Sequence, residues 1–155
     1  MGPQALVVSG DVVIADHIQS SLTYGGVRST VVRDPNEALT ALDAASTKRL
    51  ELDLVIIDVD IVGVNGVASD IKLVDEIRAA PRDTTVGSAR RLRHLPIIVL
   101  TDNLTTQVKD EVWTIDRYIP VLPRTNLERF DLLAAVQNRL AAYRHELLQS
   151  VQRVG

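Results

Sequence analysis

The sequence predicts a doubly wound α/β domain built on a five-stranded parallel sheet. Short apolar runs alternate five times with segments of helical period, and this pattern calls for parallel strands joined by right-handed helical crossovers. Apolar residues make up 46% of the 155 residues and aromatic residues only 3%. The core must therefore consist mainly of Val, Ile, Leu and Ala, as in strands covered on both faces. The length fits a single domain over residues 1–155.

The first two strand–helix units have clear starting signals. "ALVVS" (5–9) predicts a strand, and Asp11 can cap a helix that runs to about Thr23, in which apolar residues recur three and four apart. "VRSTVV" (27–32) predicts the second strand. The second helix starts in "DPNEAL", where Asp34 can serve as the N-cap, with proline at the first helical position and glutamate at the third.

The second half of the pattern holds three further strands. "LDLVIID" (52–58) is more apolar than the strands before it, which predicts a central strand. A loop and a helix over about 67–79 follow. "LPIIVLT" (95–101) predicts the fourth strand, and a helix over about 104–113 leads to a short fifth strand, "RYIPVL" (117–122).

The last helix is expected over 126–154, about twice the length that closing such a domain requires. Along it runs an apolar seam of heptad type, interrupted by Ser150. The seam residues are Leu133, Val136, Leu140, Tyr143, Leu147 and Val154. Exposed apolar seams are usually interfaces. We therefore expect the last part, 141–154, to form a homodimer or to link the domain to a longer protein.

Composition excludes several function classes. The net charge of −3 gives no general attraction to nucleic acid or to anionic membranes. The absence of cysteine removes disulfide and thiolate chemistry and fits a cytoplasmic protein. No apolar run approaches the ~18–20 residues of a membrane span, and "MGPQALVVSG" lacks the basic and long apolar regions of a signal peptide. The partners are expected to be proteins.

One basic segment, residues 80–94, interrupts the regular pattern. Its cationic residues are Arg82, Arg90, Arg91, Arg93 and His94. No aromatic residue interleaves with them, so a nucleic-acid surface is not indicated. The segment is interpreted as a solvated loop, with a docking surface for an acidic partner as the alternative.

In an open parallel sheet the functional crevice lies at the carboxyl ends of the strands, near the switch in strand order. The residues expected at this edge are Ser9, Asp11, Asp58, Thr101 and the loop after Leu122. Three of these residues also have a purely structural interpretation: Asp11 as a helix cap, Thr101 as a strand-end or capping hydroxyl, and Asp58 as an acceptor for loop N–H groups.

The stretch "DLVIIDVDIVGVNG" (53–66), together with "LPIIVLTD", resembles the response-regulator receiver domain of CheY type. The resemblance extends over essentially the whole chain and implies a flavodoxin-like fold and a role in two-component signalling. It places Asp58 on the phosphoacceptor, Thr101 on the hydroxyl that senses the phosphoryl group, and Gly66 on the glycine that closes the loop.

The departures from this family concern the groups that carry its chemistry. Ser9 and Gly10 stand where the family has an acidic pair that holds Mg²⁺, and Leu122 stands at the position of the phosphate-binding lysine. The aromatic switch position falls on Ile119, with Tyr118 beside it. The resemblance therefore implies an atypical receiver, a pseudo-receiver, that does not depend on phosphorylation, needs no cofactor and acts through protein–protein interaction.

Three alternatives stay open. The first is a phosphorylatable atypical receiver, in which Asp11, Asp58 and Asp60 hold Mg²⁺ for transfer to Asp58. The second is a haloacid-dehalogenase-type phosphatase, which "VIIDVDIV" resembles but which needs a lysine and a later acidic pair that the sequence lacks. The third is the non-catalytic, receiver-like wing domain of pyridoxal-phosphate amino-acid decarboxylases, which "RYIPVLPRTNLERFDLLAAVQNRLAAYRHELL" resembles. No enzymatic activity is expected of this chain.

Overall fold

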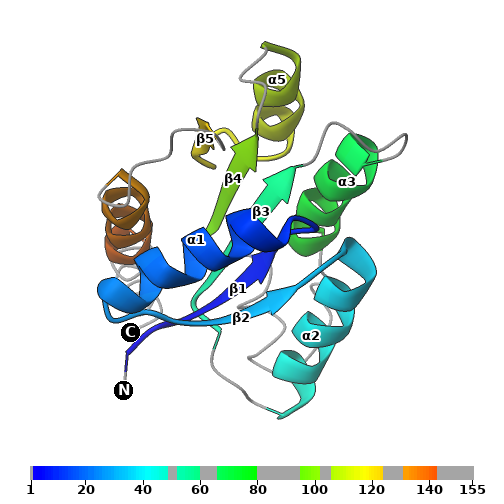
Figure 1. Cartoon of the computed structure of the whole chain (residues 1–155). Coiled ribbons are helices and arrows are strands. Elements are labelled where there is room, and N and C mark those ends of the chain that lie inside the picture. The colour runs from blue at the N-terminus through cyan, green and yellow to red at the C-terminus, as the bar shows by residue number, and fades with distance from the viewer. Residues whose placement is uncertain are drawn as a thin grey trace, which may run out of the picture.

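A computed structural model describes residues 2–48, 52–59, 66–79, 95–101, 106–123 and 131–142. Five parallel strands form one sheet in the order β2-β1-β3-β4-β5, which confirms the predicted fold class (Figure 1). The strands are β1 (Gln4–Val8), β2 (Arg28–Val32), β3 (Leu54–Val59), β4 (Ile97–Thr101) and β5 (Val121–Pro123). The helices are α1 (Val12–Tyr24), α2 (Pro35–Lys48), α3 (Gly66–Arg78), α5 (Thr106–Ile115) and one over 131–142.

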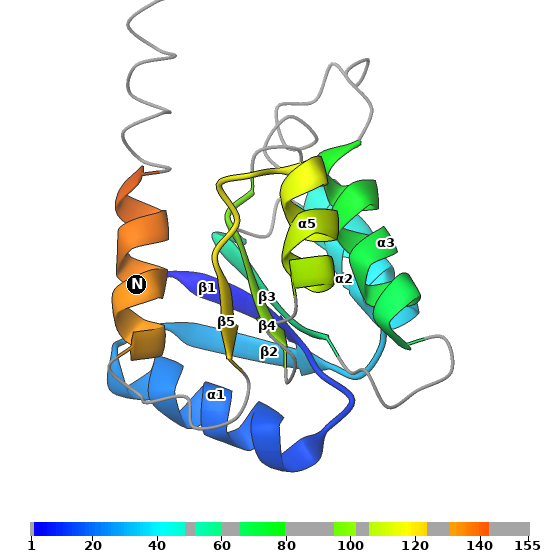
Figure 2. The ribbon, with the colours of Figure 1, turned by 90° about the horizontal axis from the view of Figure 1, so that it is seen from above.

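The helices cover both faces of the sheet, so the molecule has three layers (Figure 2). On one face α2, α3 and α5 pack over the odd-numbered residues of β3, namely Val55, Ile57 and Val59. On the other face α1 and the helix over 131–142 pack over Leu54 and Ile56. Every residue of β3 is buried, as expected for the most apolar strand at the centre of the sheet.

The fifth strand is shorter than the predicted 117–122. Strand β5 begins at Val121, and the residues before it form a turn. The Asp116 carboxylate accepts a hydrogen bond from Tyr118 N–H at 2.9 Å, and Arg117 and Tyr118 are exposed. The aspartate bonds its own backbone two residues on, a local alternative to pairing with β4.

The helix over 131–142 belongs to the core of the domain. Leu132 and Val136 are 0% exposed and pack with α1 and the sheet. Leu133 lies so close to the end of α1 that a Cβ on Gly25 would come within 2.5 Å of its side chain. A side chain at position 25 would therefore require the Leu133 side chain to shift.

This helix includes half of the predicted seam. Leu133, Val136 and Leu140 are buried within the domain, so in this structure they are core residues and not surface open to a second copy. Tyr143, Leu147 and Val154 lie outside the described residues, as do 126–130 and the basic segment 80–94. Of the described helices, none combines the length and apolar character needed to cross a membrane.

Candidate functional site

The strand order places a switch point between β1 and β3. From β1 the chain passes to β2 on one side, while β3, β4 and β5 follow on the other. Crevices for ligands form at such a point, at the carboxyl ends of the two strands. Ser9 directly follows β1, and Asp58 is the last residue but one of β3. The two residues therefore meet where the fold favours a site.

Asp58 is buried and hydrogen-bonded to Ser9. The residue is 3% exposed, and its Oδ2 accepts a hydrogen bond from Ser9 Oγ at 2.7 Å. This length is typical of a hydroxyl donating to a carboxylate. The Ser9 hydroxyl is thus hydrogen-bonded to one oxygen of the carboxylate that the sequence analysis placed at the phosphoacceptor position.

Ser9 is itself held in place by the backbone around it. Its N–H donates to Val32 O at 3.0 Å, and its hydroxyl oxygen accepts from Asp11 N–H at 3.2 Å. A serine hydroxyl has one proton to give, and the short contact to Asp58 is where that proton is best used. Ser9 is 3% exposed, so this bond is shielded from water.

Asp11 caps α1, as its sequence context predicted. Its Oδ1 accepts hydrogen bonds from Val13 N–H at 2.9 Å and Ile14 N–H at 3.2 Å. These are N–H groups that have no partner within the helix. The carboxylate that caps α1 is the same one that was a candidate Mg²⁺ ligand together with Asp58 and Asp60.

A cross-strand row continues from Asp58 toward the edge of the sheet. Asp58 lies opposite Leu100, and Leu100 lies opposite Leu122 in β5. Leu100 is fully buried, and Leu122 packs against the same apolar cluster. The row next to Asp58 is therefore a hydroxyl on one side and two leucines on the other. Among the described residues it contains no cation.

Thr101 ends β4 one residue farther along. It is 0% exposed and lies opposite Val59 and Pro123 in the strand register. It lies at the carboxyl edge of the sheet, where the sequence placed it, but one position beyond the residue opposite Asp58. The aromatic position is different: Ile119 is 1% exposed and part of the core, whereas Tyr118 is 64% exposed.

The described residues do not show the three candidate Mg²⁺ ligands, Asp11, Asp58 and Asp60, together. No group of three or more His, Cys, Asp or Glu side chains comes together in the part of the chain that the structure describes. Asp58 and Asp11 make the hydrogen bonds given above, and Asp60 lies outside the described residues. Mg²⁺ is usually held by one or two carboxylates and completes its octahedral shell with waters and phosphate oxygens.

The structure resembles several crystal structures of receiver domains. A response-regulator receiver domain from Methanospirillum hungatei matches with a TM-score of 0.69 at 16% identity, over 94% of this chain and 99% of that one. The signal receiver domain of an HD-domain protein from Pseudomonas fluorescens matches with 0.71 at 19%, over 94% and 99%. A putative response regulator from Chloroflexus aurantiacus matches with 0.69 at 22%, over 91% and 99%.

The chain has the CheY-like receiver fold. No family model matches it, and no curated protein matches its sequence. On the receiver fold two of the departures seen in the sequence, Ser9 and Leu122, fall in one row at the carboxyl edge, where they flank Asp58 and Leu100. Both substitutions could be identified from the sequence. The hydrogen bond between Ser9 and Asp58 could not be, because it depends on the register of β1 and β3, which no local sequence pattern contains.

The site can therefore hold a buried carboxylate but offers little to a phosphoryl group. Phosphoryl transfer depends on positive charge that compensates the transferring oxygens, from metal ions or from Lys and Arg. In the cross-strand row, Asp58 has the neutral hydroxyl of Ser9 on one side and the apolar Leu100 and Leu122 on the other. Position 10 has room for a side chain, since a Cβ there would lie 3.6 Å from Arg33 O. A Cβ at this position would therefore cause no clash.

Proposed function

We propose that this chain is a receiver-like regulatory domain that works by binding other proteins and does not depend on phosphorylation of Asp58. The observation that carries the proposal is the 2.7 Å hydrogen bond from Ser9 to the Asp58 carboxylate, in a row completed by Leu100 and Leu122. The receiver fold supports a signalling role, and the composition of this row argues against phosphotransfer.

The physical reason lies in charge. When an acceptor carboxylate attacks the phosphorus of a donor and the donor's leaving group departs, the negative charge on the transferring phosphoryl oxygens must be compensated, normally by a metal ion and a lysine. Leu122 has no charge, and Ser9 donates a single hydrogen bond that already stabilises the carboxylate itself. Asp58 then serves as a hydrogen-bond acceptor that fixes the end of β3 against β1.

The deciding experiment treats the full chain with acetyl phosphate, and separately with beryllofluoride, in the presence of Mg²⁺. We expect no adduct on Asp58 by intact mass or by ¹⁹F NMR. As a matched variant, Ser9→Asp combined with Leu122→Lys restores an acid and a cation to the row, and we expect an adduct there. Adding Asp58→Asn to this variant should abolish it again.

A stable adduct on the unaltered chain, absent from Asp58→Asn, would contradict the proposal. It would favour a phosphorylatable atypical receiver. One observation speaks for this second function: Asp58 and Thr101 both lie at the carboxyl ends of neighbouring strands, β3 and β4. Asp11 and Asp60 would then contribute to cation binding.

We further propose that the chain is cytoplasmic, non-enzymatic and homodimeric. The absence of cysteine fits a reducing compartment. The described residues offer no cluster of metal-ligating side chains. The part of the heptad seam that remains for a second copy consists of Tyr143, Leu147 and Val154, because the structure buries the earlier seam residues in the domain.

A further inference from the structure

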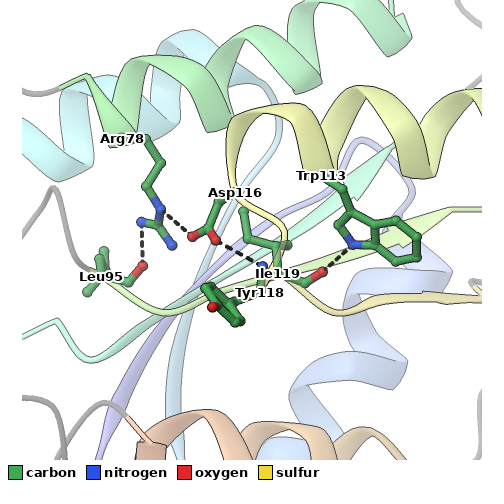
Figure 3. Close-up of polar contacts among 6 residues, drawn as sticks. All are labelled: Arg78, Leu95, Trp113, Asp116, Tyr118 and Ile119. Carbon is green, nitrogen blue, oxygen red and sulfur yellow. Dashed lines mark hydrogen bonds and ion pairs between the residues drawn. The ribbon is translucent and has the colours of Figure 1, made fainter.

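A network of hydrogen bonds holds the carboxyl end of α5 and the turn before β5 (Figure 3). We call it the amino-edge clamp. It consists of the side chains of Arg78, Trp113 and Asp116 and the backbone groups of Leu95, Tyr118 and Ile119. Leu95 lies just before β4 and Ile119 just before β5. The clamp is therefore at the amino edge of the sheet, whereas Asp58 is at the carboxyl edge.

Trp113 joins α5 to the start of β5. Its indole Nε1 donates a hydrogen bond to Ile119 O at 2.9 Å. The Ile119 side chain is 1% exposed and anchored in the core, so the acceptor is fixed. The indole itself is 42% exposed. The hydrogen bond thus positions a large ring while leaving part of it open to solvent.

Asp116 holds the turn from the end of α5. Its carboxylate accepts hydrogen bonds from Tyr118 N–H at 2.9 Å and from Arg78 Nε at 3.0 Å. Burial raises the pKa of Asp116, but the Tyr118 N–H and the Arg78 guanidinium outweigh burial and keep this pKa below its ordinary value. The carboxylate is therefore ionised, and its bonds are charge-assisted.

Arg78 extends the clamp to a third and a fourth element. From the last turn of α3, its Nη1 donates to Leu95 O at 2.7 Å while its Nε binds Asp116. The side chains of Arg78 and Asp116 are 14% and 20% exposed. The planar guanidinium fixes both directions at once. One side chain therefore relates α3, the start of β4 and the end of α5.

The clamp is remote from the candidate site. Asp58 is opposite Leu100, which is five residues along the strand from Leu95. At roughly 3.3 Å per residue the two lie about 16 Å apart along the sheet. The strand between them, from Ile97 to Leu100, is fully buried and apolar. The hydrogen bonds of the clamp all join groups at the amino edge.

We propose that the amino-edge clamp sets the conformation of the end of α5, which carries the exposed Trp113, and of the turn before β5, which carries the exposed Tyr118, independently of the state of Asp58. The inference rests on the proposed function, because a domain that regulates without phosphorylation must present its surface without a signal from Asp58. The surface around these two rings is then constitutively formed.

The test uses the single tryptophan of the chain. In the ¹⁵N-labelled full chain the Trp113 indole N–H gives one cross-peak, whose position and hydrogen-exchange rate report on the bond to Ile119. We expect Asp58→Asn, and beryllofluoride with Mg²⁺, to leave the peak in place and its exchange rate within about twofold. Asp116→Asn should raise that rate about tenfold, as expected for loss of a charge-assisted bond.

Asp110→Asn is the matched control, because Asp110 is an exposed carboxylate on the same helix; its indole exchange should equal that of the unaltered chain. If Asp116→Asn does not fold by circular dichroism, Arg78→Lys replaces it. Lysine keeps the positive charge but lacks the planar guanidinium that binds Leu95 O and Asp116 at once. Faster exchange of the Trp113 indole N–H is again expected. Unchanged exchange in the clamp variant, or an indole peak that moves in Asp58→Asn, would overturn the proposal.

The beryllofluoride arm separates this inference from the proposed function. If ¹⁹F NMR shows a bound complex while the indole peak stays in place, the proposed function fails and the clamp inference stands. If the complex forms and the peak shifts, both fail. If no beryllofluoride complex forms, the indole peaks of Asp58→Asn and of the clamp variants test the inference without it.

Discussion

Among single residues, Asp116 is the one whose ionisation contributes most clearly to stability. Its folded-state pKa lies below its ordinary value of 3.8, so the folded state favours the charged carboxylate. The stabilisation is then fully present above about pH 4 and is lost as the pH falls through the folded pKa. We predict that Asp116→Asn lowers the free energy of unfolding by about 1.5–3 kcal/mol at neutral pH.

Urea unfolding at pH 7 and at pH 3 checks this prediction. The difference between the unaltered chain and Asp116→Asn should shrink at the lower pH, because pH 3 lies below the ordinary pKa of 3.8, so the unfolded chain takes up a proton that the folded carboxylate resists. A difference that is the same at both pH values would show that the ionisation of Asp116 does not matter. Asp110→Asn should change stability little at either pH.

The hydrogen-bond partners of a residue could be predicted from the sequence only where those partners lie close by in the chain. The Asp11 cap was predicted because its partners, Val13 and Ile14, lie two and three residues away. The partner of Asp58 is 49 residues away and that of Arg78 is 38 residues away. Such pairs depend on strand register and helix docking, which a local pattern does not contain.

At the scale of elements, apolar periodicity predicted each described strand and helix, and the errors lie at their ends. The fifth strand was placed over 117–122 because "RYIPVL" is rich in β-forming residues, but the cap made by Asp116 turns its first part away from the sheet. The seam on the last helix was assigned to an interface, although its first three members are buried within the domain. Periodicity marks an apolar face without saying what covers it.

The packing of the helix over 131–142 leads to an element-scale prediction. Leu132 is 0% exposed in the cluster shared with α1 and the sheet. Leu132→Ala should therefore lower the free energy of unfolding by about 2–5 kcal/mol, through lost burial and a cavity. Gln137→Ala, at an exposed position of the same helix, should stay within about 0.5 kcal/mol.

Chemical denaturation followed by far-UV circular dichroism measures both variants. Equal stabilities of Leu132→Ala and Gln137→Ala would mean that the helix is not an integral part of the domain. That result would return the whole seam to a role in association. A large loss for Leu132→Ala alone would establish the helix as part of the folding unit.

At the scale of the whole molecule, the two edges of the sheet differ in character. The carboxyl edge carries a carboxylate tied to a serine beside two leucines, and the amino edge carries an ion pair and two exposed aromatic rings. The described aromatic residues, Tyr24, Trp113 and Tyr118, are all exposed, so the described core is aliphatic. Tyr and Trp are enriched at protein interfaces. This arrangement favours a molecule that acts through its surface.

Association is the last prediction at this scale. With Leu133, Val136 and Leu140 in the core, a dimer through the last helix must use Tyr143, Leu147 and Val154. We predict that the full chain is a dimer by light scattering and that Leu147→Glu, which places a charge in the seam, raises the dissociation constant about a hundredfold or more. Gln149→Glu adds the same charge outside the seam and should leave the dimer intact. Leu147→Glu chains that remain dimeric would show that the seam is not the interface, and a monomeric full chain would remove the homodimer from the proposed function.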